Sequence, residues 1–127
     1  MLSPIPRRIL RDTLELSVPS GFDRYQAPLD PVVYTVHNVH IQNNNETRKT
    51  ASNTDVVLRA ILFVDACYST PALDYWALQE AAQAAGGVMT CTVTDKRGGV
   101  SGPYTVIVVD GLPDDEDNLH HWELGLV

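Results

Sequence analysis

Alternation of apolar side chains near the C-terminus constrains the fold of this 127-residue chain more than any other feature. Trp122, Leu124 and Leu126 are separated by single residues that are polar or lack a side chain. A period of two places successive side chains on opposite faces of a strand, so residues 119–126 are expected to form a half-buried strand. Residues 104–109 (YTVIVV) are mostly β-branched and are expected to form an adjacent antiparallel strand.

Four further segments carry strand signals, and turn residues bound them. They are residues 13–18, 32–42, 55–64 and 88–94. His37 and Asn38 interrupt the second segment and indicate a β-bulge. Between the first two segments, residues 22–26 are expected to form an aromatic and polar hairpin tip.

A single helix is expected over about residues 70–85. Thr70 suits the N-cap and Pro71 the first turn, while Gly86 and Gly87 would end the helix. The alanine-rich sequence between them has high helix propensity. Helical spacing places one face on the sheet, formed by Leu73, Trp76, Ala77 and Ala81.

These elements predict a mainly β domain of the α+β type. We expect a small antiparallel β-barrel or sandwich of about six strands, with the helix inserted at about 70–85 and a long hairpin loop at about 43–54. One domain would span residues 1–127, with residues 1–11 as an extended N-terminal arm. Apolar runs are too short to cross a bilayer, and residues 1–8 lack the apolar core of a signal peptide. We therefore expect the chain to act in the cytoplasm or in an assembly built there.

The formal net charge of −7 argues against a general nucleic-acid binder. The charge is distributed unevenly, however, because Arg7 and Arg8 lie near the start and an acidic loop lies near the end. Such opposite charges could attract complementary surfaces of neighbouring subunits, and the alternative is that both are ordinary solvated surfaces. The acidic interface candidates are Asp114, Asp115, Glu116 and Asp117.

A polar segment, residues 43–54, joins the second and third expected strands and contains no large apolar side chain. Loops of this length are usually functional or mobile, and an ordinary mobile loop is the alternative here. The candidate functional residues in it are Asn43, Asn44, Asn45, Glu46, Arg48 and Lys49.

No catalytic constellation emerges from the sequence, so no enzyme activity, cofactor or metal is expected. A zinc site combining His40, His121 and Asp114 would need a chance tertiary arrangement, because residues three apart or adjacent on a strand face opposite ways. Residues 95–99 (DKRGG) resemble half of a phosphate loop but are better explained as a hairpin turn. Cys67 and Cys91 are expected to be free buried thiols, and a disulfide between them is the alternative.

Several segments together resemble the small minor capsid proteins of tailed bacteriophages, which are encoded between the major capsid and major tail proteins in phages of Gram-positive bacteria. The resemblance covers most of the chain, from about Ile5 to the end. It points to a head–tail connector protein, above all the stopper, or head-closure, protein. The segments are FVDA (63–66), STPALD (69–74), GG (86–87), DKRGG (95–99), VDGLPDD (109–115) and LHHWE (119–123).

The resemblance implies a homo-oligomeric ring of about six or twelve copies at the head–tail junction of the virion, between the adaptor under the portal and the tail terminator or tail tube. Loop 43–54 would project into the channel and retain the packaged DNA, with Arg48 and Lys49 facing phosphates or an acidic neighbour. No membrane partner is implied. The inserted helix departs from the simplest stopper barrels, so a tail terminator or other tail-completion protein is the closest alternative. A small β-barrel binding module, with a pocket beneath Trp76 and Trp122, is the alternative from another class.

Overall fold

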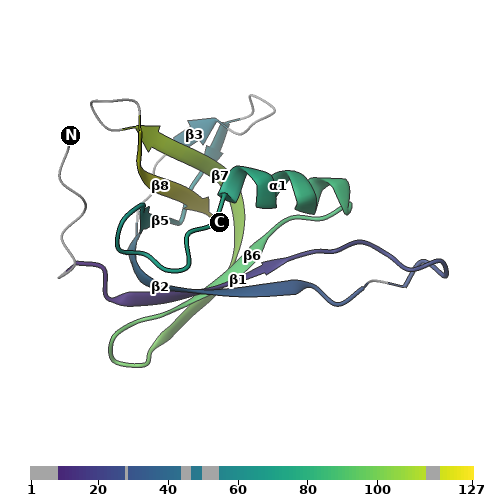
Figure 1. The fold of residues 1–127 in the computed structure, drawn as a ribbon, viewed down its shortest axis with the longest axis horizontal. Helices are drawn as coiled ribbons and strands as arrows, with labels where there is room; N and C mark the ends of the chain where they lie inside the picture. Colours follow the sequence, from purple (N-terminus) through teal and green to yellow (C-terminus); the bar gives the residue numbers. More distant parts are fainter. Residues whose placement is uncertain (1–8, 28, 44–46, 50–54, 114–117) are drawn as a thin grey trace.

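Six antiparallel strands close into a barrel in the order β1-β2-β5-β8-β7-β6, as the fold class predicted from the sequence requires (Figure 1). The computed structural model describes residues 9–27, 29–43, 47–49, 55–113 and 118–127. A separate two-stranded sheet pairs β3 (Thr47–Lys49) with β4 (Asp55–Val57). The barrel strands are β1 (Asp12–Val18), β2 (Val32–Asn43), β5 (Ala60–Asp65), β6 (Thr90–Thr94), β7 (Val100–Pro113) and β8 (Leu119–Leu126). The helix α1 (Tyr75–Ala84) lies between β5 and β6 in the chain.

The barrel interior is filled by the apolar half of each alternating strand. In β8, Trp122, Leu124 and Leu126 are buried, as their period of two predicts. β8 lies between β5 and β7, so the C-terminal strand is a full member of the sheet. Closing the sheet leaves the barrel strands without a long unpaired edge. The fully buried side chains from other strands include Leu14, Leu16, Val36, Val39 and Leu62.

β7 is longer than residues 104–109, because it pairs first with β6 and then with β8. The Gly102-Pro103 pair forms a β-bulge inside this strand, since Cys91 pairs with Tyr104 and Val93 with Ser101. Gly102 has φ +109°, and a Cβ there would lie 3.0 Å from the Cys91 carbonyl oxygen. Residues 110–113, which follow the expected strand 104–109, also belong to β7.

The expected strand over residues 55–64 is interrupted at Leu58 and Arg59. The β3–β4 ladder ends at Val57, and the Arg59 N–H donates instead to the carbonyl of Leu126 in β8, at 2.8 Å. The Leu58 side chain turns into a second core cluster with Ile61 and Val108. The burial of Leu58 thus separates the barrel strand β5 from the outer strand β4.

The helix begins later than expected, at Tyr75, and Asp74 rather than Thr70 is its N-cap. Thr70 is unavailable because its backbone pairs with His37 of β2, with N···O distances of 2.7 and 3.1 Å. The expected face is also wrong: Tyr75 and Ala82 are buried, whereas Trp76, Ala77 and Ala81 are exposed. The helix end is as predicted, with Gly86 at φ +78°. No helix in the described part of the chain is long and apolar enough to cross a membrane.

The β-bulge predicted at His37 and Asn38 is confirmed, since Asp12 pairs with Val39 and Thr13 with His37. Asn38 is left unpaired at φ +62°, and its amide Nδ2 donates to the carbonyl of Tyr68 at 3.0 Å. The Ser69 hydroxyl donates to the Asn38 carbonyl and accepts from the Asp65 N–H. This buried network ties the loop after β5 to the middle of β2.

Candidate functional site

The polar loop predicted at 43–54 is partly a strand pair. Asn43 is the exposed last residue of β2 and pairs with Ala60 of β5. Arg48 and Lys49 lie in β3 and pair with Val56 and Asp55 of β4. The other loop candidates, Asn44, Asn45 and Glu46, lie outside the described residues.

The predicted interface residues at the two charged segments also lie outside the described residues. They are Arg7, Arg8, Asp114, Asp115, Glu116 and Asp117. The ladder between β7 and β8 runs to the pair Pro113–Leu119, so the acidic segment 114–117 connects two paired strand ends. Of the expected N-terminal arm, residues 9–11 are described, and the Arg11 N–H donates to the Ile9 carbonyl at 3.1 Å.

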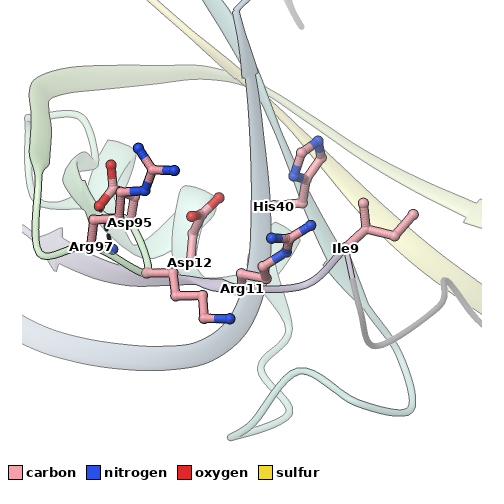
Figure 2. Close-up of a pocket in the computed structure, with 7 residues that line it drawn as sticks. Ile9, Arg11, Asp12, His40, Asp95 and Arg97 are labelled. Carbon is pink, nitrogen blue, oxygen red and sulfur yellow. Dashed lines mark hydrogen bonds between the residues drawn. The ribbon is translucent and has the colours of Figure 1, made fainter.

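A pocket of about 320 Å³ lies at the start of β1, and we name it the basic hollow. Figure 2 shows Arg11 and Asp12 lying between the β6–β7 turn, which carries Asp95 and Arg97, and the His40 side chain of β2. Sequence reasoning identified the turn correctly but missed this pocket, because three separated segments form it. Its lining consists of Ile9, Arg11, Asp12, His40, Asp95, Lys96 and Arg97.

The carboxylates of the basic hollow bind backbone amides. Asp12 Oδ2 accepts from the Ile41 N–H at 3.1 Å, across the first β1–β2 pairs. Asp95 Oδ1 accepts from the N–H groups of Arg97 and Gly99, at 2.9 and 2.8 Å, which closes the turn. The pocket also carries the cationic side chains of Arg11, Lys96 and Arg97. The cationic groups outnumber the carboxylates, so the hollow favours an anionic group such as a carboxylate or a phosphate.

A second pocket of about 330 Å³ adjoins the first and shares Ile9 and His40 with it, and we name it the aromatic hollow. Its other lining residues are Gln42, Phe63 and His121. The Phe63 ring lies between the two imidazoles, with centroids 6.0 Å from His40 and 6.1 Å from His121. A row of flat rings beside an isoleucine suits an aromatic or aliphatic side chain from a partner.

His120 and His121 face one another, contrary to the expectation that adjacent strand residues point apart. A bulge causes this, because Leu112 pairs with His121 and Pro113 with Leu119, leaving His120 extra. The two Nδ1 atoms are 2.8 Å apart, and His121 Nε2 lies 3.0 Å from Glu123 Oε2. If His121 donates from Nε2 to the carboxylate, its Nδ1 accepts and His120 Nδ1 donates.

Trp76 and Trp122, beneath which the alternative of a binding module would place its pocket, lie against each other. The Trp76 ring packs edge-on against Trp122, with centroids 4.7 Å apart, and its Nε1 donates to the Val109 carbonyl at 3.1 Å. Gly111 leaves room for it, since a Cβ there would lie 2.7 Å from the Trp76 ring. The cavity beside Tyr75 and Trp122 is about 20 Å³, which suits one water molecule rather than a ligand.

Within the described ranges, no group of three or more His, Cys, Asp or Glu side chains could hold a metal ion. Phe63 separates His40 from His121, and Asp114, the third member of the disfavoured zinc set, is not among the described residues. Cys67 and Cys91 are both free, but only Cys91 is buried, so the expectation of two buried thiols is half right. Burial raises the pKa of the Cys91 thiol to about 12, which makes it unreactive near neutral pH.

Comparison of the chain with protein-family models, with curated proteins and with solved structures found no match.

Proposed function

We propose that the chain is a structural subunit of the head–tail connector of a tailed bacteriophage, most specifically the stopper ring that closes the DNA channel. The observation that carries the proposal is the outer hairpin, formed by β3 and β4, on a closed barrel. This hairpin carries Arg48 and Lys49, the two cations of the predicted channel loop.

The outer hairpin adds nothing to the closure of the barrel. β2 and β5 pair directly from Val39–Val64 to Asn43–Ala60, so a two-residue turn after Asn43 would suffice to connect them. Residues 44–59 make this connection instead. The short strands β3 and β4 within them pair with each other and not with the barrel strands. Val57 of β4 is exposed although it is apolar. Within this connection, Leu58 belongs to the second core cluster and Val56 packs against it. A connection longer than the barrel needs is nevertheless typical of a functional element.

In a ring, copies of the barrel would form the wall and the outer hairpins would point toward the axis. Arg48 and Lys49 would then meet the phosphates of the packaged DNA, and several copies would narrow the channel together. The adaptor and portal would bind one face of the ring and the tail terminator the other. The role needs no catalytic group, cofactor or metal, and it places the protein in the virion.

A tail terminator is the second candidate, and the helix α1 on the outside of the barrel favours it. α1 departs from the simplest stopper barrels, and small ring proteins with both helix and sheet are also expected at the top of the tail. Loss of a stopper would leave heads without DNA. Loss of a terminator would leave filled heads that lack joined tails.

The proposal is tested by replacing residues 50–54 with Asn-Gly in the phage that encodes the chain. Lys49 and Asp55 form the last described pair of the outer hairpin, so a two-residue turn can join them without disturbing the barrel. We expect a folded protein, assembled heads and loss of packaged DNA, measured as the fraction of filled heads by electron microscopy.

A double variant, Arg48→Ala with Lys49→Ala, separates the charge of the hairpin from its length. We expect it to lower DNA retention less than the shortened hairpin does. Normal DNA retention by the shortened variant would refute the gating role.

A further inference from the structure

The β1–β2 hairpin, described over residues 19–27 and 29–31, reaches well beyond the barrel at the right of Figure 1. Its turn is ordered by its own side chains, because Asp23 Oδ1 accepts from the N–H groups of Tyr25 and Ala27, at 2.8 and 3.0 Å. The Ser20 hydroxyl donates to the Asp30 carbonyl at 2.6 Å across the base. We name this element the arm.

Several large apolar side chains are exposed to solvent on the arm and on the first residues of β2. Tyr25 is 74% exposed and Phe22 55% exposed, and the Arg24 guanidinium covers the Tyr25 ring at 4.8 Å. Rigid aromatic side chains next to an arginine are the residue types that most often anchor protein interfaces. The other exposed apolar residues here are Leu29, Val32 and Val33.

The two hollows lie at the opposite end of β1. Asp12, at the start of β1, lines the basic hollow, whereas Val18, at its other end, pairs with Val32 at the base of the arm. Seven strand residues separate these ends by about 20 Å, and the arm extends further still. In Figure 1 the start of β1 and the arm accordingly lie at opposite ends of the long axis.

The surfaces at the two ends are complementary in kind. The arm offers the aromatic anchors Phe22 and Tyr25 to a hollow of about 330 Å³ lined by flat rings and Ile9. The arm also carries two carboxylates, Asp23 and Asp30, against one arginine, whereas the adjoining basic hollow carries three cationic side chains against two carboxylates. A contact between two different patches at opposite ends of the subunit is heterologous, so it can repeat from copy to copy. Such a series closes into a ring when the rotation between neighbouring copies divides a full turn evenly.

From this arrangement we propose that the arm of one copy docks into the aromatic and basic hollows of the next copy. The partner is therefore a second copy of this chain. The inference rests on the ring-subunit part of the proposed function and adds the surface through which the subunits join. The Tyr25 ring enters the aromatic hollow, and the carboxylates of the arm face the basic hollow.

The test uses the full chain in two single-surface variants. The arm variant is Tyr25→Ser with Leu29→Ser, and the hollow variant is Gln42→Arg, which fills the aromatic hollow from an exposed position. Val57→Ser is the matched control, because Val57 is an exposed apolar residue on the separate β3–β4 sheet. Circular dichroism first verifies that each variant is folded, and sedimentation velocity up to about 1 mM then measures association.

We expect the wild type and the control to form species larger than dimers, and each single-surface variant to associate at least about tenfold more weakly. A mixture of the arm and hollow variants should form dimers and nothing larger, because one intact contact remains between them. Association of either variant at the wild-type level would overturn the inference, and so would a wild type that stays monomeric throughout. The DNA-retention test of the outer hairpin is independent of both results. Failure of the docking surface and failure of the stopper role therefore remain distinguishable.

Discussion

The substitution Asp65→Ala should destabilise the protein strongly, because Asp65 organises the loop that follows β5 and bonds to β2. Its side chain is 2% exposed, and Oδ2 accepts from the N–H groups of Cys67 and Tyr68, at 2.8 and 2.9 Å. Hydrogen bonds to a charged group contribute about 1.5–3 kcal/mol each, so the two together contribute about 3–6 kcal/mol. Cys67 is exposed and Tyr68 half-buried, so water can reach part of the backbone that the substitution leaves without a partner. We therefore expect the free energy of unfolding to fall by about 2–4 kcal/mol.

A matched control is available in the same chain. Asp95 accepts from two backbone N–H groups in the same way, at 2.8 and 2.9 Å, but in an exposed turn. Asp95→Ala should therefore cost about 1 kcal/mol or less. Urea unfolding at neutral pH, followed by circular dichroism, gives both free energies of unfolding. Equal losses for Asp65→Ala and Asp95→Ala would refute the argument that burial makes the Asp65 network strong.

Three further predictions concern packing, thiol reactivity and alkaline pH. Gly125→Ala should lower the free energy of unfolding by about 1–3 kcal/mol in a thermal or urea melt, because the new Cβ would lie 2.9 Å from the Val108 Cβ in the core. A colorimetric thiol reagent at pH 8 should titrate one cysteine in the native protein, the exposed Cys67, and two after denaturation, when Cys91 is released. Burial raises the pKa of Cys91 from 9.0 to about 12 and also raises that of Tyr75, so the unfolded chain loses these protons first. Stability should accordingly be full below about pH 9 and fall as the pH rises toward about 12, which urea melts across that range would show. A flat alkaline profile would contradict this.

Alternation and local turn chemistry predicted the barrel well. The buried series Trp122, Leu124 and Leu126 follows from period two alone, and the bulge at Asn38 follows from an interruption of that pattern. The turn at residues 95–99 also follows from its glycines and its capping aspartate. Each of these features is determined within a few neighbouring residues.

The features that sequence reasoning missed depend on distant partners. Thr70 suits an N-cap by type, but its backbone is held by His37, more than thirty positions away in the chain, so the helix begins at Tyr75. His120 and His121 meet because of a register shift against β7, which their own spacing does not reveal. The two hollows are surfaces that form only when strands distant in the chain come together. The hairpin tip at residues 22–26, by contrast, was predicted correctly from its aromatic and polar residues, although its reach beyond the barrel was not.

The proposed stopper role makes one directly visible prediction. It predicts that electron cryo-microscopy of virions assembled with this chain will show a ring of barrels at the head–tail junction, with the outer hairpin of Thr47–Lys49 and Asp55–Val57 facing the DNA channel. It would be contradicted if the chain were absent from the junction, or if the outer hairpin lay on the outside of the ring away from the channel.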